Sequence, residues 1–324
     1  MRVFYLYNPL FFIGWFLLVV GMMVAVSTDS CLTAWLGMEL NLVGLMGVFA
    51  VRECLVPAVK IKYFVVQCIA SSMFLVGILS LKGGEVGDDM GGLALCSGAV
   101  VQVSLFLKIG VFPLHTWVPS VINSSGWLET WLLLTVQKLA PFVLVGMWGG
   151  SRFLLAVAAG SALVGGVGGL NQSAIRGILA YSSFVHTGWM LVGVVESLSL
   201  FAFYFLVYAV QLAVLVGSCV ALHRTSLMRG GGSLLGGLSM VSLSGMPPFA
   251  GFAPKLFLLL SVDSKGGLVM PLLGSVISMK YYTSACCAMV VECASFWDWR
   301  LWGWTWLFVV FTVFVYGCLF ASFY

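Results

Sequence analysis

The feature that most constrains this chain is a series of apolar stretches, each about twenty residues long, that follow one another along its length. Such a stretch crosses the hydrocarbon layer of a bilayer as a helix, because a helix satisfies its own backbone N–H and C=O groups. Of the 324 residues, 61% are hydrophobic and only 8% are charged, against roughly 25% charged in soluble domains. We therefore predict an all-α polytopic membrane protein without a soluble domain.

Polar and glycine-rich breaks divide the chain into eleven candidate spans. They lie near residues 4–26, 31–50, 60–81, 92–122, 127–149, 152–170, 174–196, 199–223, 234–262, 268–292 and 303–322. With eleven spans, the loops on the N-terminal side carry Arg2, Arg52, Lys60, Lys62, Arg176, Arg224, Arg229 and Arg300, and those opposite carry Lys82, Arg152 and Lys265. This imbalance predicts an N-terminus in the cytoplasm or matrix. We expect no cleaved leader, since the first span begins at once without a cleavage site.

Two of the spans are too long for a single helix and contain prolines, which remove a backbone hydrogen bond and break helices. These are the fourth span, near 92–122, with Pro113 and Pro119, and the ninth, near 234–262, with Pro247, Pro248 and Pro254. They lie five spans apart, so they occupy the same place in two repeats near 4–149 and 152–292, followed by a final helix near 303–322. An odd number of helices per repeat makes the second repeat inverted, as in transporters with broken helices at their binding sites.

Four charged residues lie where charge is costly: Glu39, Lys108, Lys138 and Lys255. Each costs roughly 2.5–3.5 kcal/mol at the bilayer centre if it is unpaired. One acid and three amines are suited to a proton relay, because the proton affinity of lysine responds strongly to its surroundings. We expect Lys108 near the negative C-terminal end of a half-helix and Lys255 in the first turn of another, where the positive end disfavours an ammonium. Structural ion pairs or snorkelling side chains are the alternative interpretation.

Two histidines are further candidates for the relay. His115 and His186 can exchange protons near neutral pH. A buried histidine is as often simply hydrogen-bonded, so both interpretations stay open. Four other charged residues near loops, Glu129, Arg152, Arg176 and Glu196, are expected to be solvated. The nine scattered cysteines contain no Cys-x-x-Cys pair, so we predict no metal site.

Several motifs resemble one family when taken together. They are Gly37-Met38-Glu39-Leu40-Asn41, Lys60-x-Lys62-Tyr63-Phe64-x-x-Gln67, Lys108-Ile109-Gly110-x-x-Pro113-x-His115-x-Trp117-Val118-Pro119, Gln137-Lys138-Leu139-Ala140-Pro141, Gly168-Gly169-Leu170-Asn171-Gln172-x-x-x-Arg176, His186-x-Gly188-Trp189-Met190 and Gly245-Met246-Pro247-Pro248-x-x-Gly251-Phe252-x-Pro254-Lys255. The chain resembles the subunit 2 family of mitochondrial NADH–ubiquinone oxidoreductase, respiratory complex I, which is related to Mrp-type cation/proton antiporters. The match is weak after about residue 265.

The resemblance implies a fold, a place and a set of roles. It implies that residues 1–324 form a single antiporter-like transmembrane domain in the membrane arm of complex I, in the mitochondrial inner membrane, with the N-terminus on the matrix side. Glu39 would pair with Lys108, which would connect to a central Lys138 and then to Lys255. Partners would be the other membrane-arm subunits, including neighbouring antiporter-like ones, and the lipid bilayer, with no nucleic acid. NADH, FMN, iron–sulfur clusters and ubiquinone would bind in other subunits, and this chain would hold no cofactor.

Two other functions stay open at this point. A free-standing cation/proton antiporter could have the same fold, and a structural spacer of the membrane arm would need no proton path. The density of motifs favours a subunit that translocates protons, driven by electron transfer from NADH to ubiquinone elsewhere in the complex.

Overall fold

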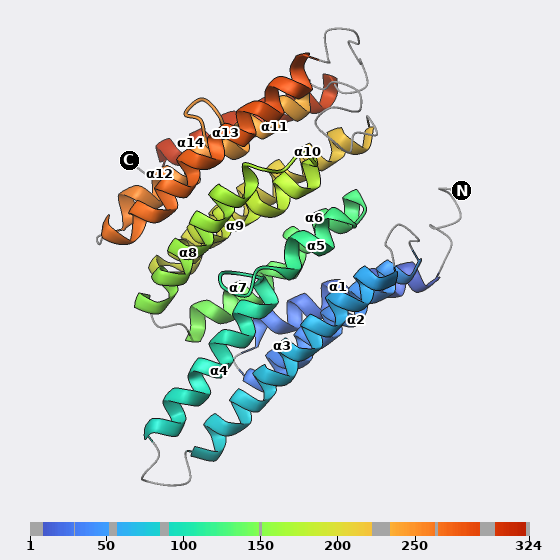
Figure 1. Ribbon diagram of the computed structural model, residues 1–324, viewed down its shortest axis with the longest axis vertical. Coiled ribbons are helices and arrows are strands. Elements are labelled where there is room, and N and C mark those ends of the chain that lie inside the picture. Colours follow the sequence, from blue (N-terminus) through green and yellow to red (C-terminus); the bar gives the residue numbers. More distant parts are fainter. Residues whose placement is uncertain are drawn as a thin grey trace. The chain divides into compact units, whose positions relative to one another are not determined.

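The computed structural model describes residues 9–28, 30–51, 57–84, 91–148, 151–221, 234–262, 265–291 and 302–321. The described chain consists of helices joined by turns, which confirms the predicted all-α fold. It divides into two compact units, Met1–Gly150 and Ser151–Tyr324. Figure 1 shows the helices of the first unit in blue to green and those of the second in green to red.

The first unit contains seven described helices. They are α1 (Pro9–Ser27), α2 (Cys31–Val51), α3 (Pro57–Gly84), α4 (Gly91–Ile109), α5 (Trp117–Asn123), α6 (Trp127–Leu134) and α7 (Val136–Trp148). Helix α1 packs along α2, α3 packs along α4, and α7 contacts both α1 and α4 (Figure 1). The α1–α2 contact is close because it is lined by glycine: a Cβ atom on Gly21 would lie 2.4 Å from the backbone nitrogen of Asn41.

The second unit contains the remaining described helices. They are α8 (Ser151–Gly169), α9 (Ile175–Glu196), α10 (Leu198–Ala221), α11 (Leu234–Ser244), α12 (Phe252–Ser261), the 3₁₀ turn η2 (Lys265–Leu268), α13 (Val269–Val291) and α14 (Trp302–Ala321). Helix α9 is buried along nearly its whole length, because α8, α10, α12 and α13 all pack against it. Buried polar residues on α9 are therefore inside the unit rather than facing lipid.

Several of these helices can cross a membrane. In the described part of the chain, six are long and apolar enough by themselves: Pro9–Ser27, Cys31–Val51, Pro57–Leu81, Trp127–Met147, Ile175–Glu196 and Leu198–Ala221. Shorter apolar helices include Leu234–Ser244 and Phe252–Ser261. Large apolar side chains such as Phe16, 67% exposed, cover the outer face of α1, as expected for a surface in contact with lipid. The polytopic membrane fold is confirmed, whereas the count of eleven spans stays a prediction.

Both predicted helix breaks are present, one in each unit. The first, residues 110–116, separates α4 from α5, and the second, residues 245–251, separates α11 from α12. Each begins at a glycine with positive φ, Gly110 at 75° and Gly245 at 82°. This conformation ends helices and is disfavoured for residues with a Cβ atom. The inverted relation between two repeats stays a prediction.

A third interruption lies in the fifth predicted span, near 127–149. It is at Thr135, between α6 and α7, where φ is −117° and ψ is −81°, whereas Pro141 lies inside α7. The backbone N–H and the hydroxyl of Thr135 both donate to the carbonyl of Trp131. Back-bonding of this kind bends helices, and it places the interruption three residues before Lys138.

Candidate functional site

An acid and a lysine meet inside the first unit. Glu39 lies on α2 and Lys108 in the last turn of α4, with 4.0 Å between Glu39 Oε1 and Lys108 Nζ. The Lys108 side chain is only 5% exposed, whereas that of Glu39 is 28% exposed. At this separation the pair attracts without a direct hydrogen bond, so a small movement can close or open it.

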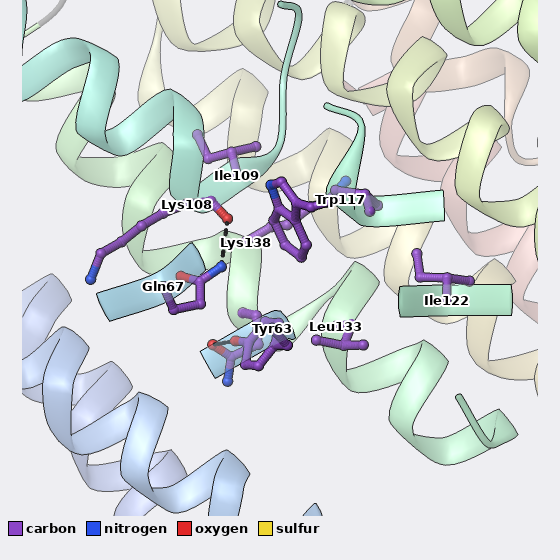
Figure 2. A pocket seen from close by; sticks show the side chains of 10 residues that line it. Tyr63, Gln67, Lys108, Ile109, Trp117, Ile122, Leu133 and Lys138 are labelled. Atoms are coloured by element: carbon purple, nitrogen blue, oxygen red, sulfur yellow. Dashed lines mark hydrogen bonds between the residues drawn. The ribbon is translucent and has the colours of Figure 1, made fainter. Parts of the chain in front are cut away.

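The carbonyl groups at the end of α4 are held by neutral side chains. The indole Nε1 of Trp117, from α5, donates to the carbonyl of Leu107 at 3.2 Å. The amide Nε2 of Gln67, from α3, lies 3.4 Å from the carbonyl oxygen of Lys108, as Figure 2 shows. Because these groups satisfy carbonyls that the break exposes, the Lys108 ammonium is free to face Glu39.

A cavity joins Lys108 to the second buried lysine, Lys138. Its lining residues are Tyr63, Gln67, Lys108, Ile109, Trp117, Val118, Ile122, Leu133, Gln137 and Lys138 (Figure 2). A water-sized molecule has about 10 Å³ of space in it, roughly enough for one ordered water. Lys138 is 3% exposed and lies in the first turn of α7, just after the interruption at Thr135. Two amines and several polar groups thus share one small space that can hold ordered water.

A chain of polar side chains ties the helices of this site together. Gln137 donates from Nε2 to Asn41 Oδ1 at 2.9 Å, and its Oε1 accepts from the Tyr63 hydroxyl at 3.2 Å. This connection links α2, two residues beyond Glu39, to α7, one residue before Lys138, and to α3. Sequence reasoning did not assign a role to these three residues. The sequence does contain a signal for two of them, because Asn41 lies close to Glu39 and Gln137 lies next to Lys138.

The third lysine faces the second helix break. Lys255 lies in the first turn of α12, as expected, and is 6% exposed. Its Nζ donates to the carbonyl of Ser244, the last residue of α11, at 2.9 Å. This contact also brings the ammonium to the negative C-terminal end of α11, which the sequence did not predict. The side chain can reach back because Gly245 leaves room; a Cβ atom there would lie 2.7 Å from Nζ.

His186 is surrounded by tyrosines of the second unit. Its Nδ1 lies 2.9 Å from the hydroxyl of Tyr204 and its Nε2 lies 3.3 Å from that of Tyr282, while the ring of Tyr208 packs 4.8 Å away. One ring nitrogen donates and the other accepts in the neutral imidazole. The side chain is therefore buried and hydrogen-bonded on both sides, an arrangement compatible with either of the two interpretations.

His115 lies away from the cavity, and Glu129 is buried rather than solvated. His115 lies in the first break, where its Nδ1 is 3.1 Å from the carbonyl of Pro113, and it is not among the residues that line the cavity. Glu129, expected to be solvated, is 1% exposed in the first turn of α6. The prediction was wrong because the connection between α5 and α6 is short and buried, with Ser125 fully covered.

The described fold consists of apolar helices with two breaks, one between α4 and α5 and one between α11 and α12. A buried lysine lies beside each break, Lys108 at the first and Lys255 at the second. This combination is that of an antiporter-like membrane protein. Residues 27–279 match the family described as NADH:quinone oxidoreductase/Mrp antiporter, transmembrane. The chain belongs to this family. The match includes Glu39, all three buried lysines and both breaks, but not α14.

Known proteins similar to this chain agree with that assignment. The NADH-ubiquinone oxidoreductase chain 2 of Mytilus edulis is 40% identical over 275 residues, covering 85% of each chain. The protein of the same name from Branchiostoma floridae is 34% identical over 295 residues, covering 85% of this chain and 83% of the relative. A chain of respiratory complex I from Thermus thermophilus superposes with a TM-score of 0.80 at 25% identity, covering 87% of this chain and 71% of that one.

Proposed function

We propose that this chain is a proton-translocating membrane-arm subunit of an NADH:quinone oxidoreductase of the complex I type. Protons pass along Glu39, Lys108, Lys138 and Lys255, driven by electron transfer elsewhere in the complex. The observation that carries the proposal is the cavity lined by both Lys108 and Lys138, with Glu39 4.0 Å from the Lys108 ammonium.

The first unit supplies a mechanism for the transfer. A closed Glu39–Lys108 pair stabilises the ammonium, and opening the pair removes its counter-charge. The proton then leaves Lys108 for Lys138 through water in the cavity that both residues line. Trp117 and Gln67, the neutral caps of the α4 carbonyls, keep the helix end intact while the charge of Lys108 changes.

The second unit supplies groups for the next part of the path. Tyr208 packs against His186, and Gln211 lies one turn further along α10. Among the described residues, the Tyr208 hydroxyl, Gln211 Nε2 and Ser242 Oγ are buried without a hydrogen-bond partner. Groups of this kind bind water in proteins. We infer that they carry protons between His186 and Lys255, whereas His115 lies outside the path.

The rest of the proposal concerns the setting of the chain. It places the chain in the mitochondrial inner membrane with its N-terminus on the matrix side, beside other antiporter-like subunits. NADH, FMN, iron–sulfur clusters and ubiquinone bind in other subunits, so this chain responds to redox chemistry without performing it. Its relatives from Mytilus edulis and Branchiostoma floridae support this setting by their names.

The relay is tested by Glu39→Gln and Lys138→Met, each in the assembled complex in sealed vesicles. Protons moved per NADH oxidised should fall in both, because removing a proton-transferring group slows transfer by about 10²–10⁴-fold. Lys280→Met, which removes an exposed lysine from α13, is the matched control and should leave the ratio unchanged. An unchanged ratio in both test variants would indicate a structural spacer.

The assembly is tested separately. A native gel of mildly solubilised membranes is stained for NADH oxidation and probed for this chain. Co-migration with a very large NADH-oxidising band supports the complex I assignment. Migration away from that activity would instead indicate a free-standing cation/proton antiporter. This chain also shares its fold with a chain of the Mrp complex from Dietzia, with a TM-score of 0.72 at 20% identity.

A further inference from the structure

The second helix break contains backbone groups that need partners from outside the break. Pro247 and Pro248 have no N–H, and the backbone hydrogen bonds around this segment include Phe249 N–H to the Met246 carbonyl and Phe252 N–H to the Phe249 carbonyl. Inside a membrane protein, irregular backbone is tolerated only where protein or water satisfies its polar groups. The donors that reach the carbonyls of residues 245–251 from elsewhere in the fold therefore determine where this segment lies.

One such donor comes from the last helix of the chain. The hydroxyl of Tyr316, on α14, donates to the carbonyl of Pro247 and lies 3.1 Å from the carbonyl oxygen of Phe249. Both acceptors belong to the break. A single hydroxyl shared between two carbonyls holds the middle of the segment against α14.

Apolar packing supports the same contact. Val315, next to Tyr316, is 2% exposed and belongs to a buried cluster with Ala250 in the break, Ala253 in α12 and Val207 in α10. Two small alanines allow α14 to approach the break closely, so the Tyr316 hydroxyl reaches the backbone. The contact is thus a packed joint rather than an isolated surface hydrogen bond.

The break that Tyr316 contacts connects the two residues of the Lys255 hydrogen bond, Ser244 and Lys255. Ser244, whose carbonyl accepts from Lys255 Nζ at 2.9 Å, immediately precedes the break, and Lys255 follows it by one turn of α12. A shift of the Pro247–Phe249 backbone must move one of these two ends relative to the other. The position of the Lys255 ammonium consequently depends on where α14 holds the break.

We propose that Tyr316 is a positioning residue for Lys255, acting through the carbonyls of Pro247 and Phe249. The inference rests on the proposed function, because it gives α14 a role in the relay at Lys255. Helix α14 lies beyond residues 27–279, which the family matches.

The contact itself is tested with Tyr316→Phe, which removes only the hydroxyl. In the assembled complex, amide hydrogen exchange in the peptide spanning 245–252 should become about two- to tenfold faster, the factor that one net hydrogen bond represents. Thr312→Val is the matched control, since the Thr312 hydroxyl donates to the Val309 carbonyl of its own helix at 2.6 Å. Equal exchange in Tyr316→Phe and Thr312→Val would overturn the proposed contact.

The role in the relay is tested by protons moved per NADH in the same complex. Tyr316→Phe should lower this ratio, whereas loosening of α14 alone would reduce the amount of assembled complex and leave the ratio unchanged. Because Tyr316 acts through Lys255, adding Tyr316→Phe to Lys255→Met should lower the ratio no further than Lys255→Met does alone. A ratio unaffected by Tyr316→Phe, or a further loss in the double variant, would overturn the positioning role.

Failure of the proposed function gives a different pattern. If Lys255→Met leaves the ratio unchanged, the relay at Lys255 is wrong, and the positioning role falls with it even where hydrogen exchange confirms the contact. If Lys255→Met lowers the ratio and Tyr316→Phe does not, the relay stands and only the inference about Tyr316 is wrong.

Discussion

The two helix breaks begin alike and then use their lysines differently. Each half-helix ends at a glycine with positive φ, Gly110 in the first unit and Gly245 in the second. At the first break the lysine precedes the glycine, and its ammonium faces the carboxylate of Glu39. At the second break the lysine follows the glycine by ten residues, and its ammonium donates back to the helix end.

The difference lies in which groups cap the exposed carbonyls. At the first break, Trp117 and Gln67 supply neutral N–H donors. At the second break, the Lys255 ammonium is itself a donor to the last residue of α11, Ser244. Protonation of Lys108 therefore acts mainly through its charge, whereas protonation of Lys255 is tied to the hydrogen bonding of the break. The same local fold thus places a lysine beside a carboxylate in one unit and against a helix end in the other.

The largest effect is expected from a steric change at the second break. A Cβ atom on Gly251 would lie 1.9 Å from the carbonyl oxygen of Ser242, a backbone atom that cannot rotate away. Gly251→Ala should cost about 3 kcal/mol or more and strongly reduce the assembled complex on native gels. Gly217→Ala, on α10 with open space around its Cβ, is the control and should assemble normally.

The corresponding change at the first break should be milder. A Cβ atom on Gly110 would lie 2.3 Å from Val118 Cγ2, which belongs to a buried side chain rather than to the backbone. Gly110→Ala then has to shift that side chain in addition to the cost of its φ of 75°, about 1–2 kcal/mol, but it meets no backbone atom as close as the one that Gly251→Ala meets. If Gly110→Ala assembles less well than Gly251→Ala, the second break is not the more tightly packed of the two.

The next effect separates the two lysines by stability. Lys255→Met removes the ammonium donor from the buried Ser244 carbonyl, a loss of about 1–3 kcal/mol. Lys108→Met should cost less, because the helix end keeps its neutral donors, Trp117 and Gln67. The measurement is the midpoint of thermal dissociation of the purified complex. Equal shifts in the two variants would show that Lys255 does not cap the break.

A smaller effect is expected from one of the neutral caps. Trp117→Phe keeps an aromatic ring beside Tyr63 and removes the N–H that donates to Leu107. The thermal midpoint should fall by the equivalent of about 0.5–1.5 kcal/mol. The shift should stay below that of Lys255→Met, since Gln67 still contacts the carbonyl of Lys108. A larger shift than that of Lys255→Met would mean that the first break depends on a single cap.

The sequence predicts those features that are costly to place in lipid. Apolar runs, prolines in overlong spans and charges within spans identify the helices, both breaks and the four charged residues. The sequence does not predict which backbone carbonyls the side chains contact. Lys255 reaches past Gly245 to a carbonyl eleven residues earlier, and the fifth span is interrupted at Thr135, where no proline or glycine indicates a break. The burial of Glu129 and the contact of Tyr316 with the break likewise have no local signal, because neither pattern nor spacing states which helix will lie beside a residue.

The smallest effect on stability is expected at Glu39. At 4.0 Å the Glu39–Lys108 pair has no direct hydrogen bond to lose, and glutamine keeps the size and shape of the glutamate side chain that it replaces. Glu39→Gln should therefore leave the thermal midpoint of the complex close to that of the unmodified protein. Its effect on protons moved per NADH should nevertheless be large, because the counter-charge of Lys108 is gone.

This separation of activity from stability is what distinguishes the two breaks. At the second break, Lys255→Met should lower the proton ratio and the thermal midpoint together, since one ammonium serves both. At the first break, Glu39→Gln should lower only the proton ratio, since Trp117 and Gln67 keep the helix end closed. If Glu39→Gln instead destabilises the complex as much as Lys255→Met does, the ion pair is a structural element. The first break would then depend on charge for its stability in the same way as the second.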